Sequence, residues 1–118
     1  MHAIRFVFLF VTVALMAPVE AAWAAKRVAL VIGNSDHEHV PELANPANDA
    51  ADMSARLKSL GFLVIEGRDL TLTDMRNKVR EFMATLSDAD IGLFYYAGHG
   101  LQVNGKNYLA PVDAQLIT

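Results

Sequence analysis

A single histidine stands between two glycines at Gly98-His99-Gly100, directly after an apolar segment of the chain. An imidazole takes up and releases a proton near neutral pH, so His99 has the chemistry of a general acid or base. The flanking glycines allow the backbone to approach a ligand closely, and the backbone N–H of Gly100 can serve as an oxyanion donor. The alternative interpretation is a plain turn between a strand and a hairpin, with the histidine pointing to water.

Two further histidines form an H-x-H pattern, His37 and His39, beside Asp36 and Glu38. Such a group can bind a metal ion, but two ligands on one loop are a weak signal, and we expect an exposed polar loop and no metal site. No segment resembles a calcium-binding EF-hand loop. Gly33 stands without the G-x-G-x-x-G pattern of dinucleotide-binding proteins, so we expect no cofactor.

The elements that must position His99 alternate between strand and helix patterns. Short apolar segments ended by glycine or polar residues predict strands at 27–33, 62–70 and 91–97. Between them, Asn45-Pro46 predicts the start of a helix that Gly61 ends, and Thr71 or Thr73 can cap a second helix. The expected apolar stripes of the two helices are Ala50, Met53, Leu57 and Leu60, and Met75, Val79, Phe82, Met83 and Leu86. After His99, Asn104-Gly105 predicts a type I′ hairpin.

This order predicts an α/β fold, with right-handed crossovers, a mostly parallel sheet and helices on both faces. In such sheets, ligands bind outside the carboxyl ends of the strands. The loops after Gly33, after Arg68 and at residues 98–100 should meet there, which places His99 where chemistry usually happens.

Composition limits the possible functions. The 118 residues have room for one domain. The 10 Lys and Arg against 13 Asp and Glu give a net charge of −3, with no basic run, so nucleic acid is not an expected partner. The 53% hydrophobic content is slightly above the usual range, and one N-terminal segment accounts for the excess.

That segment has the pattern of a secretory signal peptide. One positive charge at Arg5 precedes an uncharged apolar stretch over residues 6–19, and Ala22-Trp23-Ala24 fits an A-x-A cleavage site. We expect residues 1–24 to be a signal peptide outside the fold, and residues 25–118 to form a domain that is periplasmic or secreted. The alternative is an uncleaved anchor, which would be the one contact with a membrane. The chain has no cysteine and so forms no disulfide.

Four segments of the chain together resemble a known family: RVALVIGNSDHEHVPEL, NPANDAADMSARLKSLGF, DADIGLFYYAGHG and NYLAPVDA. They are similar to the large-subunit, p20-like part of bacterial caspase-like cysteine peptidases, in the caspase and metacaspase superfamily. The similarity runs from about Lys26 to the end of the chain, and YYAGHG is its most specific element.

The resemblance implies a caspase-hemoglobinase fold and a peptide or protein substrate. It implies that His99 is the histidine of a Cys-His dyad and that the N–H of Gly100 contributes to the oxyanion hole. It also implies that Asp49 helps to line a pocket for a basic P1 side chain of the substrate. The other interpretation of Asp49 is a solvent-facing carboxylate in a first helical turn, where the helix dipole favours it.

The chain departs from the family pattern in two respects. Aspartate-specific caspases use an arginine from the loop after the first strand, whereas residues 28–55 contain no Arg or Lys, so a preference for aspartate has no support. In caspase-like sequences the cysteine follows the histidine by about 50 residues. This sequence ends at Thr118, and we expect an incomplete domain that ends before the cysteine-bearing segment.

No other side chain is an obvious replacement for the cysteine. The serines lie outside nucleophile-elbow patterns such as G-x-S-x-G, and Ser35 is expected to make only a polar contact in its loop. Asp113 either braces a loop or approaches the site, and both possibilities stay open.

Two functions follow. The first is a cysteine-type endopeptidase that cleaves after Arg or Lys, of which this chain carries the histidine; alone it should be inactive. The second is an inactive caspase-like module that binds peptides or forms homo- or heterodimers through its sheet edge.

Overall fold

The computed structural model describes residues 4–15, 25–38 and 45–115. One sheet has the strand order β1-β4-β2-β3, and a short fifth strand, β5, also pairs with β4. The elements in chain order are β1 (Ile4–Leu15), β2 (Arg27–Gly33), α1 (Pro46–Ser59), β3 (Phe62–Arg68), α2 (Leu72–Leu86), β4 (Ile91–Val103) and β5 (Lys106–Leu109).

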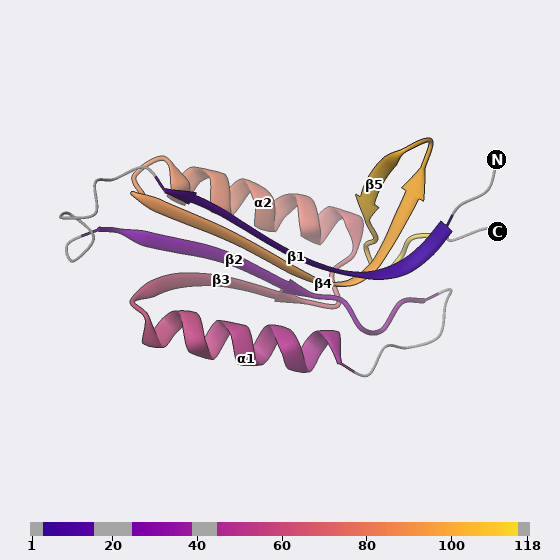
Figure 1. Ribbon diagram of the computed structural model, residues 1–118, viewed down its shortest axis with the longest axis horizontal. Helices are drawn as coiled ribbons and strands as arrows, with labels where there is room; N and C mark the ends of the chain where they lie inside the picture. Colours follow the sequence, from indigo (N-terminus) through magenta and orange to yellow (C-terminus); the bar gives the residue numbers. More distant parts are fainter. Residues whose placement is uncertain (1–3, 16–24, 39–44, 116–118) are drawn as a thin grey trace.

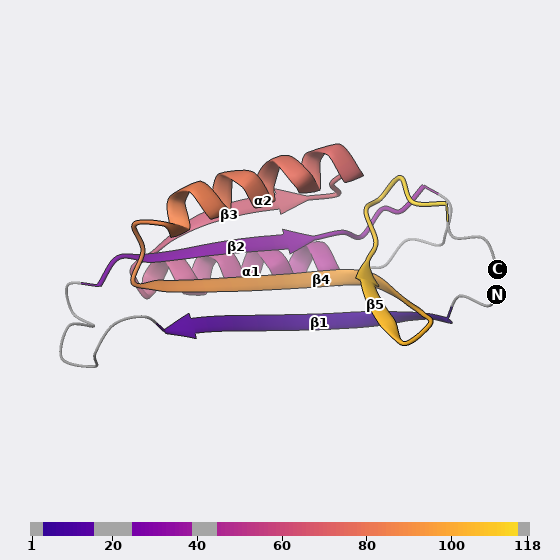
Figure 2. The ribbon, with the colours of Figure 1, turned by 90° about the horizontal axis from the view of Figure 1, so that it is seen from above.

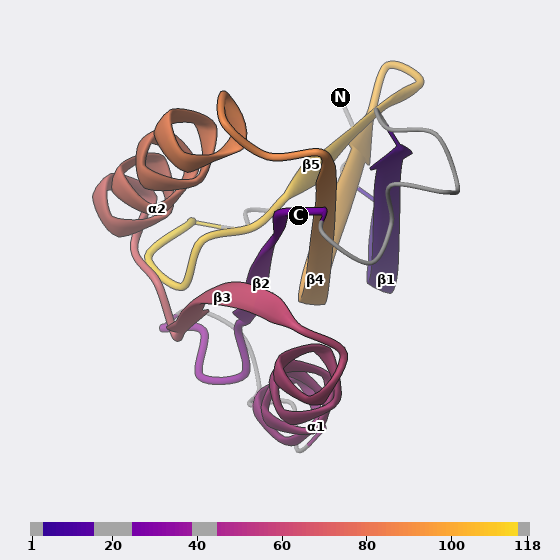
Figure 3. The ribbon, with the colours of Figure 1, turned by 90° about the vertical axis from the view of Figure 1, so that its left-hand side faces the viewer.

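The central part of the sheet is parallel, as predicted. β2 pairs in parallel with β3 on one side and with β4 on the other. α1 covers one face of the sheet and α2 covers the opposite face (Figure 1 and Figure 3). The α/β class with helices on both faces is therefore confirmed, with antiparallel pairing limited to β1 and β5 on β4.

The apolar run of β2 is explained by burial on both faces. Val28, Leu30 and Ile32 pack with Phe82 of α2, whereas Ala29 and Val31 belong to a second cluster with residues of α1. The same alternation on β4 puts Tyr96 in the first cluster and Tyr95 in the second. A sheet with two apolar faces needs a helix on each, which fixes the three-layer arrangement.

The helix boundaries agree with the prediction, but the caps differ in detail. Thr71 caps α2 by accepting a hydrogen bond from the Asp74 N–H at 3.2 Å. Asn45 is the N-cap of α1 but makes no side-chain capping bond. Leu60, expected in the apolar stripe of α1, is 53% exposed because the helix ends at Ser59.

The predicted hairpin is present between β4 and β5. Asn104 and Gly105 both have positive φ angles, of 51° and 76°, as a type I′ turn requires. β4, however, continues to Val103, so the strand is six residues longer than the predicted 91–97.

The N-terminal segment differs from the expectation that it lies outside the fold. The backbone of Ile4–Leu15 pairs antiparallel with β4 along its whole length and forms the edge of the sheet (Figure 2). An extended segment can do this because β4 otherwise presents a row of unpaired N–H and C=O groups on that side. Removal of residues 1–24 as a signal peptide stays a prediction.

In the described parts of the chain, neither helix has the length and apolarity needed to cross a membrane.

Candidate functional site

His99 lies in β4, two residues after Ala97, the last residue of β4 that pairs with β2. The parallel ladder ends at Gly33 and Ala97, and β4 then continues through residues 98–100 to pair with β5. The alternative interpretation of Gly-His-Gly as a plain turn does not hold, because β5 folds back and supplies an antiparallel partner for this segment (Figure 2). His99 is nevertheless at the carboxyl end of the parallel strands, as predicted, with its side chain half-buried.

The backbone of Gly100 faces the opposite edge of β4 from its neighbours. Ala97 O accepts from Asn34 N at 2.9 Å and His99 O accepts from Ala110 N at 3.1 Å, so these carbonyls face the β2 and β5 side. Backbone groups alternate along a strand, so the Gly100 N–H faces the other side, where Phe6 of β1 is its register partner. The Gly100 N–H can therefore donate a hydrogen bond to a substrate or to a further strand only at the edge of β4 that faces β1.

The Tyr96 hydroxyl hydrogen-bonds to the backbone of His99. Its hydroxyl lies 2.8 Å from His99 O and 3.1 Å from Ala110 O, and its single proton is shared between these two carbonyls. Burial raises the pKa of Tyr96 well above its usual value, so the hydroxyl stays a donor across the physiological range. The sequence gives no signal for this contact, because three residues of separation on a strand do not predict it.

Gly98 is required here because of close approach. A Cβ on Gly98 would lie 2.5 Å from the Tyr96 hydroxyl oxygen and 2.9 Å from Asn34 O. The tight packing that brings the tyrosine hydroxyl to His99 O therefore excludes any side chain at this position.

His37 is buried, contrary to the expected exposed loop. It is 3% exposed, and its Nε2 lies 3.2 Å from Ala110 O. Its ring meets the ring of His99 edge to face, with centroids 4.6 Å apart and planes at 83°. The burial arises because residues 34–38 turn back over the carboxyl ends of the strands, where Glu38 N bonds to Val112 O at 2.8 Å. His39 lies outside the described residues.

The loop after β2 is fixed by side chains from other elements. Asp69 Oδ1 accepts from the backbone N–H groups of Ser35 and Asp36, at 2.9 and 3.0 Å. Ser35 Oγ accepts from Ala47 N at 2.8 Å, near the start of α1. The expectation that Ser35 makes a polar contact is confirmed, and the contact ties the loop to the helix.

Asp113 braces a loop. Its Oδ1 accepts from Leu72 N, the first residue of α2, at 3.0 Å. The possibility left open by the sequence is thereby resolved in favour of a structural contact.

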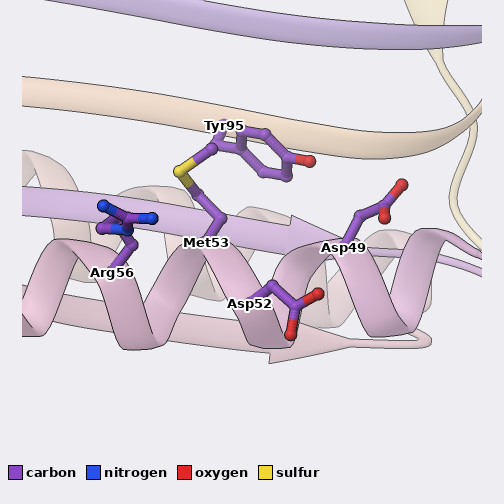
Figure 4. A pocket seen from close by; sticks show the side chains of 5 residues that line it. All are labelled: Asp49, Asp52, Met53, Arg56 and Tyr95. Carbon is purple, nitrogen blue, oxygen red and sulfur yellow. The ribbon is translucent and has the colours of Figure 1, made fainter.

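Asp49 lies in the first turn of α1 and lines a cavity of about 420 Å³ between this helix and β4. Figure 4 shows its carboxylate at one end of the cavity, on the side to which the Tyr95 hydroxyl points, with Arg56 at the other end. Among the described residues, the lining consists of Asp49, Asp52, Met53, Arg56 and Tyr95.

The electrostatics of this cavity are acidic around Tyr95. Burial, and then the charges of Asp49 and Asp52, raise the pKa of the Tyr95 hydroxyl, because a phenolate beside two carboxylates is disfavoured. Sequence analysis missed Asp52 and Tyr95; the i, i+3 spacing of Asp49 and Asp52 on a helix could have indicated a shared face.

The structure thus forms two groupings. His99 is joined by His37, Tyr96 and Ala110, while Asp49 is joined by Asp52 and Tyr95; in the described part of the chain His99 is not in the lining of the Asp49 cavity. Strand alternation puts residues 95, 97 and 99 of β4 on one face, which is the face that α1 covers. Within the described ranges, no three His, Cys, Asp or Glu side chains converge in a way that would hold a metal ion.

A family model and three curated proteins are similar to this chain, and they point to the same family. The caspase domain of peptidase family C14 matches residues 26–118. The human mucosa-associated lymphoid tissue lymphoma translocation protein 1 is 42% identical over 91 residues, which cover 77% of this chain and 11% of that protein. Its mouse homologue is 41% identical over the same length, and rat caspase-1 is 31% identical over 78 residues, covering 64% of this chain and 19% of caspase-1.

These relatives are much longer than the chain, which spans between a tenth and a fifth of their length. They are mammalian proteins, so the bacterial part of the resemblance stays a prediction. The match over 26–118 takes in both helices, the parallel strands and the segment that carries His99. This chain therefore belongs to the caspase domain family.

Proposed function

We propose that this chain carries the histidine half of a cysteine-type endopeptidase site, with His99 as the proton-transfer group and Gly100 N–H as an oxyanion donor. The observation that supports this proposal most is the geometry of β4: an imidazole stands at the carboxyl end of the parallel strands, and the next backbone N–H faces the edge. A base next to an oxyanion donor is the arrangement that acyl transfer needs.

The proposed reaction needs a cysteine that the 118 residues do not contain. In it, the thiolate attacks the peptide carbonyl, and His99 gives a proton to the amine that leaves, which yields a thioester. Water then attacks the thioester with His99 as base, and this step releases the acid and restores the thiol.

The direction from which the thiol comes can be inferred from Gly100. A reacting carbonyl oxygen must lie near the Gly100 N–H, so the nucleophile must come from the edge of β4 that β1 occupies. A strand that brings a cysteine to this edge and β1 would compete for the same row of hydrogen-bonding groups. Displacement of β1 is therefore part of the proposed function.

For the substrate, we propose a basic P1 residue, recognised by Asp49 with Asp52. The support is a cavity of about 420 Å³ with two carboxylates in its lining, on the face of β4 that includes position 99. Arg56 lies at the other end of the cavity, and its positive charge repels a basic side chain there (Figure 4). A substrate guanidinium should therefore bind at the Asp49 end.

Binding of a minimal probe to the chain tests the specificity without any need for the thiol. N-acetyl-arginine amide should shift backbone resonances of α1 and of Tyr95, whereas the citrulline analogue, which has the same shape without the charge, should not. Asp49→Asn should weaken arginine binding at least about tenfold, since a charge-assisted contact is lost. Asp74→Asn, in the first turn of α2, is the matched control and should bind as the wild type does. Equal binding of both probes would contradict the basic-P1 proposal.

The catalytic part is tested on the gene product isolated from its producing cell. Its intact mass shows whether the native protein extends beyond Thr118 to a cysteine. If it does, His99→Ala should abolish cleavage of arginine and lysine peptides while the fold is retained, and activity that survives would contradict the role of His99.

The second candidate is a non-enzymatic caspase-like module that binds peptides or pairs through its sheet edge. The observation that favours it is the edge of β4, along which an extended segment, residues 4–15, already pairs. A native mass that ends at Thr118 would support this candidate.

We also propose export to the periplasm or the medium with cleavage of the leader, on the composition of residues 6–19. A native chain that begins at Ala25 would bear out both export and cleavage. A native chain that retains Met1 would contradict the cleavage.

A further inference from the structure

His37 has a fixed position that its sequence context did not indicate. The carbonyl of Ala110 can only accept a hydrogen bond, so the contact of 3.2 Å requires the proton of His37 on Nε2. The side chain is 3% exposed, and its Nδ1 is buried without a hydrogen-bond partner in the described part of the chain. Burial and this one bond hold the ring in a single orientation.

Ala110 is the common point between His37 and the backbone of His99. Its carbonyl also lies 3.2 Å from Asn34 Nδ2 and 3.1 Å from the Tyr96 hydroxyl. Its N–H donates to His99 O, which also lies 2.8 Å from the same tyrosine hydroxyl. The His37 ring and the His99 main chain are thus held in one network of hydrogen bonds.

The two imidazoles meet edge to face, with centroids 4.6 Å apart and an angle of 83° between planes. The Nε2 of His37 is taken up by Ala110 O, and in the described part of the chain no third His, Cys, Asp or Glu side chain joins the two rings as a ligand. A metal site in a protein usually needs three or four such ligands. The contact therefore fits the packing of one ring against another, not a metal site.

We infer that His37 is a positioning residue for His99: it fixes the plane of the His99 imidazole. Rotation of an imidazole about its outer side-chain torsion is only weakly restricted by its own covalent geometry, so a neighbouring ring at right angles restricts the orientation. This inference rests on the proposed function, since a fixed plane is useful only where His99 must exchange protons with defined groups.

Nuclear magnetic resonance of the 118-residue chain tests the positioning directly. The ring protons of His99 lie beside an aromatic ring, so their chemical shifts contain a ring-current contribution from His37. In His37→Ala these signals should move and average over several ring orientations. In His37→Phe an aromatic ring is retained, and a single orientation of the His99 ring should persist.

His37→Phe should also fold. It removes the unpartnered Nδ1, and Ala110 O keeps the contacts with Asn34 and Tyr96. His37→Asn separates the two features of His37, because it keeps a hydrogen-bond donor but has no ring; it should behave as the alanine variant does. Glu38→Ala replaces the exposed side chain next to His37 and should leave the His99 signals unchanged. Backbone amide spectra show that each variant is folded.

Unchanged His99 ring signals in folded His37→Ala would overturn the inference, as would equal effects of His37→Ala and Glu38→Ala. In a cysteine-containing form that cleaves peptides, His37→Ala should lower kcat at least about tenfold with KM unchanged, and His37→Phe should restore it. If the His99 ring moves as expected but no form of the protein cleaves peptides, the positioning stands and the proposed function fails.

Discussion

Individual residues around His99 have roles that follow from very close contacts. Gly98 is the clearest case, because the Tyr96 hydroxyl and the Asn34 carbonyl occupy the space in which its side chain would lie. Such sites tolerate no added methyl group, since neither a backbone carbonyl nor a buried phenol can move away cheaply.

We expect Gly98→Ala to lower the free energy of unfolding by about 1–3 kcal/mol, as overpacking of a tight site does. Gly67→Ala is the matched control: there the added Cβ would meet the Leu70 Cδ1 atom, the end of a flexible side chain, and the loss should be smaller. Urea unfolding of both variants measures the difference. An equal loss would mean that the contacts at Gly98 are not special.

Tyr96 makes stability depend on alkaline pH. Its pKa in the folded protein is raised by burial, whereas a phenol in the unfolded chain titrates near pH 10. The folded state therefore keeps a proton that the unfolded state loses, so stability should fall as pH rises above about 10. The pKa of Tyr95 is also raised, by burial and then by the charges of Asp49 and Asp52, so this residue adds to the same loss of stability at alkaline pH.

Tyr96→Phe should reduce this alkaline loss and should cost about 1 kcal/mol at neutral pH, because the hydrogen bonds to His99 O and Ala110 O are removed. Tyr108→Phe, on an exposed side chain, is the control. Denaturant unfolding at a series of pH values measures both effects. A Tyr96→Phe variant with the wild-type alkaline slope would show that another group is responsible.

At the level of elements, the site depends on loops that are tied to helix ends. Ser35 connects the loop after β2 to the start of α1, and Asp113 connects the segment after β5 to the start of α2. Each contact satisfies a backbone N–H that the helix itself leaves without a partner. The helix starts and the loops around His99 are therefore stabilised together.

Ser35→Ala should lower the free energy of unfolding by about 1 kcal/mol, the usual value of a lost capping bond. Asn45→Ala should cost clearly less, because Asn45 makes no side-chain capping bond although it occupies the N-cap position. Thermal or urea unfolding of the two variants measures the contrast. The opposite order would mean that Asn45, not Ser35, caps α1.

At the level of the whole molecule, β4 has a side that β1 alone covers in the described structure. The register of this pair runs from Ile4 with Gln102 to Leu15 with Ile91, so residues 91–102 of β4 are all paired on this side. A chain without this segment has an open edge along the strand that carries His99 and Gly100. Open edges of this length favour pairing between molecules.

A chain that begins at Ala25 should therefore associate with increasing concentration, whereas the 118-residue chain should associate less. Sedimentation velocity over a range of concentrations measures this. In the purified truncated chain the partner at this edge can only be a second copy, so the complex should have twice the mass of the chain. A monomer at all concentrations would show that β4 does not need an edge partner.

The sequence by itself determined the order of strands and helices over residues 27–109, the α/β class and the placement of His99 at the carboxyl end of the sheet. These follow from local patterns: β2 is apolar on both faces, and Asn104-Gly105 has the backbone freedom of a tight hairpin. The prediction of family membership was possible because YYAGHG and its neighbours form a specific pattern, and the match over residues 26–118 confirms it.

Only the tertiary structure decided which residues surround His99. The burial of His37, the hydroxyl of Tyr96 at His99 O and the orientation of Gly100 N–H depend on how β5 and the loop after β2 fold over the strand ends. The pairing of residues 4–15 with β4 is likewise decided by a free edge and not by local composition, which has the pattern of a leader. Contacts between residues 60 or more positions apart, such as His37 with His99, have no signal in a single sequence, because they arise from chain topology.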